Sequence, residues 1–352
     1  SLSLAKNLIN KKINVHIYQK NKINNLSSNR TIGISKNNFE FFKKEVQDIP
    51  EKKIWKIKKI EIYSEKLKNK KIINFEKNKN NLFFIIKNDK LYKLLNKKLL
   101  RSKFYKRKII KSNNFYKKLL KENKYDLIIN CDPKNFIGKK YFLKAIVKKY
   151  NNLAYTTILK HKKLENKIAI QIFTKYGPIA FLPTSNIETS VVYSLDNNMY
   201  DEKKIIDLIK KYNPKFTIKK ISKLEKFELK SSNLRHYYYN NVLAFGDCLH
   251  KIHPFAGQGF NMTIRDIKVI SKIIQNRIDL GIQLDSLILE EFEKKTKHTN
   301  FIFSNGIDFI YKFFNFNEKV KSQKLNNVLK FLGKNKTLNN IFVKYADTGL
   351  GI

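Results

Sequence analysis

The chain has 352 residues, with 73 Lys and Arg against 29 Asp and Glu, and a formal net charge of +44 at pH 7. Lysine supplies nearly all of this charge and is spread from end to end, whereas proteins that recognise nucleic acid depend on arginine and concentrate charge on one face. We therefore expect no nucleic-acid partner, although the charge favours attraction to anionic lipid surfaces.

The length is sufficient for a substantial core and indicates two intimately connected domains. Two cysteines, Cys131 and Cys248, imply no disulfide framework and fit a reducing compartment. No signal peptide is visible, and no apolar run is long enough to span a bilayer. The chain opens directly into a helical pattern at Ser1, so we expect it to be a fragment that lacks its true N-terminus.

In chain order, apolar residues from Leu2 to Ile9 recur at helical spacing, and a strand follows at 15–18. This pair of elements is typical of the back half of a βαβ dinucleotide unit. A second helix follows Ser35, which can cap it. Alternating apolar residues predict strands within 54–87, and a helix follows at about 89–100.

An apolar strand at 125–131 ends in Asp132, which Pro133 follows. The next stretch, 144–195, is rich in strands, and a helix at about 201–212 and one more strand come after it. The last stretch, 285–352, is helical, and its aromatic residues at 301–316 indicate either burial in the core or an exposed apolar surface for a membrane or partner. We favour burial.

The most informative segment is 243–266. An apolar strand ends in Gly246 and Asp247, a loop carries Pro254, Gly257 and Gly259, and an amphipathic helix follows. This order places a carboxylate at the end of a strand, and glycines where backbone must approach a ligand closely. A helix N-terminus, with its partial positive charge, faces the same place. The site suits a cofactor that has hydroxyls and negative charge.

This segment, Gly-Asp-Cys-Leu-His-Lys-Ile-His-Pro-Phe-Ala-Gly-Gln-Gly-Phe-Asn, resembles the second flavin-binding motif of the FAD-dependent aromatic hydroxylases (flavoprotein monooxygenases). Its form is most similar to the branch that hydroxylates the ring in ubiquinone biosynthesis. Residues 167–183 resemble the same branch. More than ten matched positions in fixed order make the motif specific.

The resemblance implies an α/β fold. A Rossmann-like FAD-binding domain, a three-layer ββα structure, carries an inserted mixed β-sheet substrate domain and C-terminal helices. The expected boundaries are 1–143 with 232–284 for the FAD-binding domain, interrupted by substrate-side strands near 50–87. The β-rich substrate domain covers 144–231 and the helical segment 285–352. In the family, a strand and a Gly-x-Gly-x-x-Gly loop precede the first helix, and this front half is absent here.

The resemblance also implies the site. Asp247 would bind flavin ribityl hydroxyls, the two loop glycines would approach the flavin ring, and Pro254 and Arg30 would lie beside the reacting face as the catalytic candidates. The predicted cofactor-binding residues are Gln19, Arg30, Asp132, Gly246, Asp247, Pro254, Gly257, Gln258, Gly259 and Asn261. Two positions depart from the family, since Gln19 replaces an acidic residue and Pro133 replaces a glycine. No metal site is expected, because His250 and His253 have no acidic or cysteine companions.

The implied reaction is the hydroxylation of a hydrophobic prenylated phenol, with FAD as cofactor and NAD(P)H and O₂ as co-substrates. Two alternatives stay open: a related flavoprotein hydroxylase or reductase with another substrate, and a degenerate, non-catalytic binding protein that has kept the fold. We expect a cytoplasmic protein. Peripheral contact with the inner face of the cytoplasmic membrane and association with other ubiquinone-biosynthesis proteins are further expectations.

Overall fold

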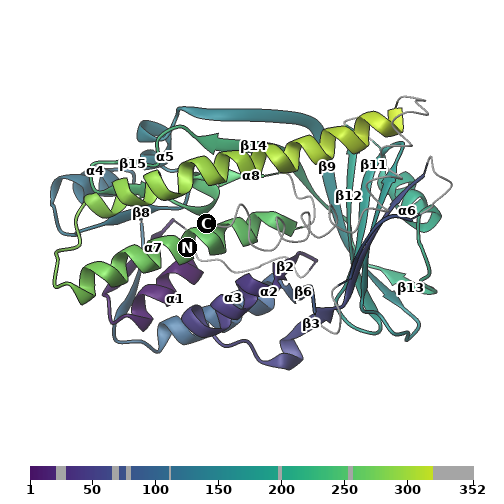
Figure 1. Ribbon diagram of the computed structural model, residues 1–352, viewed down its shortest axis with the longest axis horizontal. Coiled ribbons are helices and arrows are strands. Elements are labelled where there is room, and N and C mark those ends of the chain that lie inside the picture. The colour runs from purple at the N-terminus through teal and green to yellow at the C-terminus, as the bar shows by residue number, and fades with distance from the viewer. Residues whose placement is uncertain are drawn as a thin grey trace.

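The computed structural model describes residues 1–20, 29–65, 71–76, 81–110, 112–196, 200–252 and 257–319. A helical part with small sheets occupies one end of the molecule, and a large mixed sheet closes the other end (Figure 1). The predicted α/β organisation with an inserted mixed sheet is therefore present.

The first half of the chain forms the following elements: α1 (Leu2–Asn10), β1 (Val15–Gln19), β2 (Thr31–Ser35), α2 (Lys36–Phe41), a π-helical turn (Phe42–Val46), a 3₁₀ turn (Glu51–Lys53), β3 (Ile54–Ile57), β4 (Lys59–Ser64), β5 (Lys71–Glu76), β6 (Phe83–Lys87), α3 (Asn88–Leu100), β7 (Tyr105–Ile109), α4 (Asn114–Lys121), β8 (Ile128–Asn130) and α5 (Phe136–Tyr141).

The second half forms β9 (Ala145–His161), β10 (Ile168–Thr174), β11 (Gly177–Pro183), β12 (Glu188–Asp196), α6 (Glu202–Lys211), β13 (Ile218–Ile221), β14 (Glu225–Leu234), β15 (Tyr238–Tyr239), β16 (Val242–Ala244), a 3₁₀ turn (Gly246–Cys248), β17 (His250–Lys251), α7 (Gln258–Asp279) and α8 (Leu287–Lys319).

The large sheet has the strand order β17-β14-β9-β12-β11-β10-β4-β5, with β13 beside β9. Side chains along each strand of this sheet pack alternately into two cores, because successive side chains point to opposite faces. Ile170 and Ile172 of β10 pack against α6, whereas Phe173 packs with Met262 of α7 and Phe303 of α8. The sheet therefore has α6 on one face and the two long helices against the other.

Two small sheets face each other at the helical end. β1 pairs in parallel with β7, and β8 pairs in parallel with β16, which β15 joins. Both β1 and β8 line a cavity of about 470 Å³. Val15 and Gln19 bond to the β7 side, so the backbone groups of the intervening residues His16 and Tyr18 point toward the cavity.

One local expectation is wrong. Ser35 occupies the N-cap position of α2, but its side chain makes no capping hydrogen bond. Its hydroxyl accepts from Asn38 Nδ2 at 3.0 Å, and its backbone N–H donates to Asn261 Oδ1 at 2.9 Å. Tertiary contacts from α7 therefore replace the local cap.

The aromatic segment of α8 has both buried and exposed side chains, so the predicted burial holds for part of it. Phe303, Ile307 and Tyr311 are buried, whereas Phe301 and Phe309 are 43% and 70% exposed. The segment 320–352 of the predicted helical region lies outside the described residues. None of the described helices has the length and apolar composition needed to cross a bilayer.

Candidate functional site

The strand β16 is fully buried, and the chain turns sharply where it ends. Gly246 has φ +58, and a Cβ built there would meet nothing within 4 Å. The left-handed backbone therefore favours glycine for conformational reasons, and the space beside it is open. Asp247 follows in this turn with an exposed side chain, as expected for a carboxylate that receives a ligand.

The neighbouring strand β8 ends at the same edge. Phe245 donates its backbone N–H to the carbonyl of Asn130 at 2.9 Å, and Asn130 Nδ2 lies 3.3 Å from Cys248 Sγ. These bonds hold the Asp247 turn beside Asp132, whose carboxylate accepts from the backbone N–H of Lys134 at 2.8 Å. Burial raises the pKa of the Cys248 thiol to about 12, so the sulfur is a neutral packing group.

Gln19 lies at the carboxyl end of β1. It lines the cavity between the small sheets from one side, and Asp132 lines it from the other. The structure thus brings these two predicted residues to one cavity. Gly138 of α5, which sequence reasoning missed, supports this edge, because a Cβ there would lie 2.7 Å from the carbonyl oxygens of Asp132 and Pro133.

The glycine loop leads into α7. Gly257 is the N-cap of this 22-residue helix and has φ +65. A Cβ built on it would lie 3.7 Å from the backbone nitrogen of Gly33 in β2, an ordinary contact. Glycine is therefore favoured at Gly257 by its backbone angle, whereas Gly259 has a negative φ. Pro254 lies outside the described residues.

Gln258 is the first residue of α7 and is 1% exposed. Within the described part of the chain, neither its amide nitrogen nor its amide oxygen has a hydrogen-bond partner. A buried polar group without a partner is costly, so an unpaired amide at this position is suited to a ligand. The unpaired amide, the open Gly246 turn, the exposed Asp247 carboxylate and the positive end of a long helix together fit a cofactor with hydroxyls and anionic character.

Asn261 is fully buried in the first turn of α7. Its Oδ1 accepts from the backbone N–H of Ser35 and from Asn38, and its Nδ2 donates to the carbonyls of Gly33 and Gly257. This side chain therefore joins the glycine loop to β2 and α2.

Arg30 lies at the start of β2 with an exposed side chain. Its guanidinium carbon is 5.1 Å from the ring centroid of Phe227 in β14, and its carbonyl accepts from the backbone N–H of Asn88 at 2.9 Å. Arg30 thus lies between the small sheet of β2 and the large sheet, at the other end of β2 from Ser35 and its contact with Asn261.

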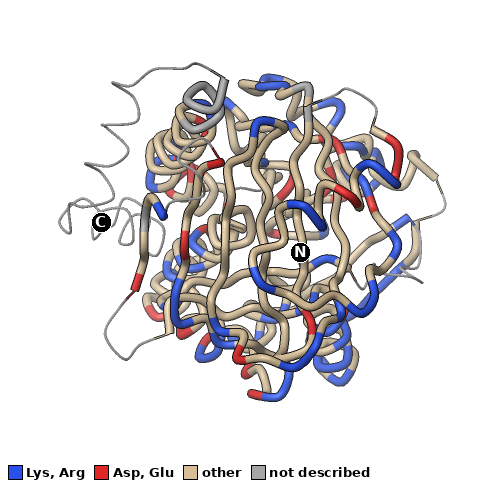
Figure 2. Tube along the Cα trace, turned by 90° about the vertical axis from the view of Figure 1, so that its right-hand side faces the viewer, with Lys and Arg blue, Asp and Glu red and all other residues tan. Residues whose placement is uncertain are grey.

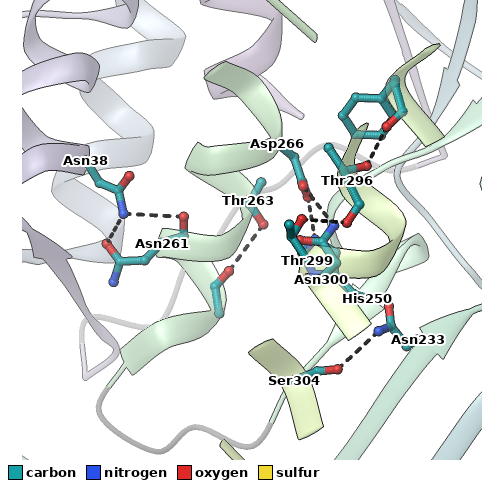
Figure 3. A network of polar contacts seen from close by, with 12 residues as sticks. Asn38, Asn233, His250, Asn261, Thr263, Asp266, Thr296, Thr299, Asn300 and Ser304 are labelled. Atoms are coloured by element: carbon teal, nitrogen blue, oxygen red, sulfur yellow. Dashed lines mark hydrogen bonds and ion pairs between the residues drawn. The ribbon is translucent and has the colours of Figure 1, made fainter. Parts of the chain in front are cut away.

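His250 belongs to a buried polar cluster that the sequence did not indicate. Its Nε2 lies 2.5 Å from Asp266 Oδ2, and Asn300 Nδ2 donates to Asp266 Oδ1 at 3.0 Å (Figure 3). The cluster joins β17, α7 and α8. Asn300 is 34 positions from Asp266 and follows no motif, so only the tertiary structure reveals their contact. Among the described residues, no three His, Cys, Asp or Glu side chains gather as a metal site would require.

Comparison with known proteins shows which protein domain contains these site residues. Residues 172–279, which include the Asp247 turn, the glycine loop and α7, match the family model of an FAD binding domain. The chain is 25% identical over 196 residues to a mitochondrial ubiquinone biosynthesis monooxygenase of Dictyostelium discoideum, covering 55% of this chain and 39% of that protein. It is 28% identical over 161 residues to 3-demethoxyubiquinol 3-hydroxylase of Escherichia coli, covering 42% of this chain and 40% of that protein. The chain thus spans less than half the length of these curated relatives.

Solved structures show the same fold over nearly the whole chain. p-Nitrophenol 4-monooxygenase from Pseudomonas putida superposes with a TM-score of 0.77 at 10% identity, covering 97% of this chain and 93% of that one. HpxO of Klebsiella pneumoniae, solved with FAD and uric acid, superposes with a TM-score of 0.71 at 9% identity, covering 98% and 93%. The predicted fold class is confirmed.

The fold and the matched domain define a flavoprotein. More specifically, the chain is similar in fold to FAD-dependent monooxygenases, and its distant relatives include ubiquinone-biosynthesis hydroxylases at about 25% identity.

Proposed function

We propose that this protein is an FAD-dependent monooxygenase that hydroxylates the aromatic ring of a prenylated phenol in ubiquinone biosynthesis. The observation that carries the proposal is the buried Gln258 amide at the start of α7, which has no hydrogen-bond partner among the described residues, in the same matched domain as the open Gly246 turn and the exposed Asp247 carboxylate. The names of the two curated relatives supply the substrate class.

In this proposal the chain holds FAD along one edge of the molecule. Asp247 would accept hydrogen bonds from ribityl hydroxyls, and the N-terminus of α7, with Gly257, Gln258 and Gly259, would face the flavin ring. Gln19 and Asp132, which line the cavity between β1 and β8, would bind toward the adenosine end. The family resemblance supports a role for Arg30 and Pro254 beside the reacting face of the flavin, and Pro254 lies outside the described residues.

Bound FAD would supply the redox chemistry that couples the two-electron oxidation of NAD(P)H to the use of O₂, with one oxygen atom entering the ring as hydroxyl and the other leaving as water. The protein supplies position and a dry environment for this chemistry. Phe173 of the large sheet packs with Met262 of α7 and Phe303 of α8, so apolar side chains lie between the sheet and these helices.

The most direct test of the reaction is isotopic. Purified protein with FAD, NADPH and a prenylated phenol under ¹⁸O₂ should yield a product that carries one ¹⁸O atom, and Asp247→Ala should lower the yield at least about tenfold, as expected for the loss of a charged hydrogen bond to the cofactor. A product labelled from water, or turnover without O₂, would favour a related reductase or another flavoprotein reaction instead.

Peripheral contact with an anionic membrane surface is a further part of the proposal, because a prenylated phenol partitions into lipid. Figure 2 shows Lys and Arg distributed over the whole of the viewed side, and Phe301 and Phe309 of α8 are exposed apolar residues. Cosedimentation with anionic vesicles should be strong at low salt and weak at high salt. Equal recovery with neutral vesicles would argue against electrostatic attachment.

A further inference from the structure

The first turn of α7 is held by a side chain whose hydrogen-bonding capacity is fully used. An asparagine amide offers two N–H donors and a carbonyl with two lone pairs. Asn261 Nδ2 donates to the carbonyls of Gly33 at 2.9 Å and Gly257 at 3.3 Å, and Oδ1 accepts from Ser35 N at 2.9 Å and Asn38 Nδ2 at 3.1 Å. All four positions are filled by protein, so Asn261 has none left for a ligand.

Further along α7, Asp266 anchors the helix to β17 and α8. Asp266 is 1% exposed and its two oxygens contact His250 of β17 at 2.5 Å and Asn300 of α8 at 3.0 Å. Asn261 and Asp266 are five positions apart, which rotates them by about 140° around the helix axis. They therefore anchor α7 in clearly different directions, as Figure 3 shows, where Asn38 and Asn300 flank the helix on opposite sides.

These anchors are polar, which makes them specific. An apolar contact tolerates a shift of the helix, whereas a buried amide or carboxylate that loses a partner is left unsatisfied at a cost of about 1–3 kcal/mol. Only one position of α7 satisfies both sets of bonds. That position also fixes the backbone of Gly257, because Asn261 binds its carbonyl directly.

We propose that Asn261 and the cluster His250–Asp266–Asn300 are positioning residues that hold the N-terminus of α7 and the glycine loop in place for the flavin. The proposal rests on the proposed function in one respect only, namely that the ligand at the helix end is FAD. In this proposal Asn261 acts by fixing the backbone of the glycine loop and does not itself contact the cofactor. Helix α8 contributes as well, because Asn300 holds Asp266 of α7, although α8 contains no part of the flavin-binding motif.

The first experiment is independent of flavin. In flavin-free protein, Asn261→Ala should speed amide hydrogen exchange in residues 257–264 at least about tenfold, as expected when a local anchor worth about 1–3 kcal/mol is lost. The milder Asn38→Ala, which removes one of the four partners, should give a smaller change in the same segment if Asn261→Ala does not fold. Asp266→Asn, which keeps the shape but removes the charge facing His250, should also raise exchange there.

The matched control is Asn166→Ala. Asn166 lies in the loop between β9 and β10, is fully buried, and donates to Ser185 O and Thr189 Oγ1, both at 2.9 Å. This variant should leave exchange in 257–264 unchanged although it lowers global stability. Equal acceleration in the control and in Asn261→Ala, or no acceleration in folded Asn261→Ala and Asp266→Asn, would overturn the positioning role.

Flavin titration then tests the link to the site. FAD dissociation constants should rise at least about tenfold for Asn261→Ala and Asp266→Asn and stay within about twofold for Asn166→Ala. Unchanged FAD affinity in variants with faster exchange would refute the link. Wild-type protein that fails to bind FAD would instead contradict the proposed function, while the exchange result would still decide whether the anchors hold α7.

Discussion

Asp247 shows how much a single residue can be predicted from the sequence. Its place after a buried strand and a glycine indicated an exposed carboxylate at a strand end, and the structure puts it in the turn Gly246–Cys248 with its side chain exposed. The pairing of His250 with Asp266 and Asn300 could not be predicted in the same way, because a hydrogen bond between separate elements leaves no periodic or local pattern in the sequence.

We predict that Asp247→Ala weakens FAD binding about ten- to a hundredfold, because hydrogen bonds that involve a charged group contribute about 1.5–3 kcal/mol. Fluorescence titration of flavin measures this directly. Asp207→Asn, an exposed aspartate on α6, is the matched control and should bind FAD like the wild type. Similar affinities for Asp247→Ala and the control would remove Asp247 from the site.

At the scale of elements, hydrophobic periodicity predicted where the helices and strands lie, whereas tertiary contacts determine where they end. The strand-rich stretch predicted at 144–195 begins with β9, whose length from Ala145 to His161 reflects its pairing with β12, β13 and β14. The cap predicted for Ser35 was lost to Asn38 and Asn261. Propensity thus located the elements, and tertiary pairing set their ends.

The turn between β10 and β11 makes a testable element-scale prediction. Gly177 has φ +127, and a Cβ there would lie 2.1 Å from the carbonyl oxygen of Ser194 in β12. Gly177→Ala must therefore move a strand and should lower the free energy of unfolding by about 3 kcal/mol or more.

Gly281 provides the control for Gly177, since its φ is also positive, at +66, and a Cβ there would meet nothing within 4 Å. Gly281→Ala should therefore lower the free energy of unfolding only by about 1–2 kcal/mol, the conformational cost alone. Urea denaturation of both variants measures the difference. Equal losses would show that the close contact with Ser194 is relieved without strain.

At the scale of the whole molecule, the sequence predicted the α/β class and the inserted mixed sheet but not the arrangement of the small sheets. Nothing in the alternation of β1 or β8 indicates that they face each other across a cavity, since strand order depends on long-range pairing. The structure gave this information through the parallel pairs β1–β7 and β8–β16 and the cavity that β1 and β8 share.

Stability at alkaline pH should report the burial of Cys248. Its pKa is raised to about 12 in the folded protein, chiefly by burial, whereas an unfolded thiol titrates near about 8.5. The folded state therefore holds the proton more tightly, so this contribution to stability is fully present below about pH 8.5 and is lost as the pH rises toward about 12.

We therefore expect wild-type protein to lose stability relative to Cys248→Ala as the pH rises through this range, because the variant has no thiol to ionise. Comparing the two proteins cancels the titration of lysines, which both share. Urea denaturation at several pH values measures the difference. A constant difference between the two proteins from pH ~8 to ~11 would show that the thiol is accessible to solvent in the folded state.

The central claim is that this chain binds and uses FAD, and the visible absorption spectrum of the protein after incubation with FAD and removal of free flavin tests it most directly. We predict a bound-flavin spectrum that bleaches with NAD(P)H under anaerobic conditions, and bleaches faster when a prenylated phenol is present. A folded protein that remains colourless after incubation with FAD would contradict the account and would favour a binding protein that has kept the fold without the cofactor.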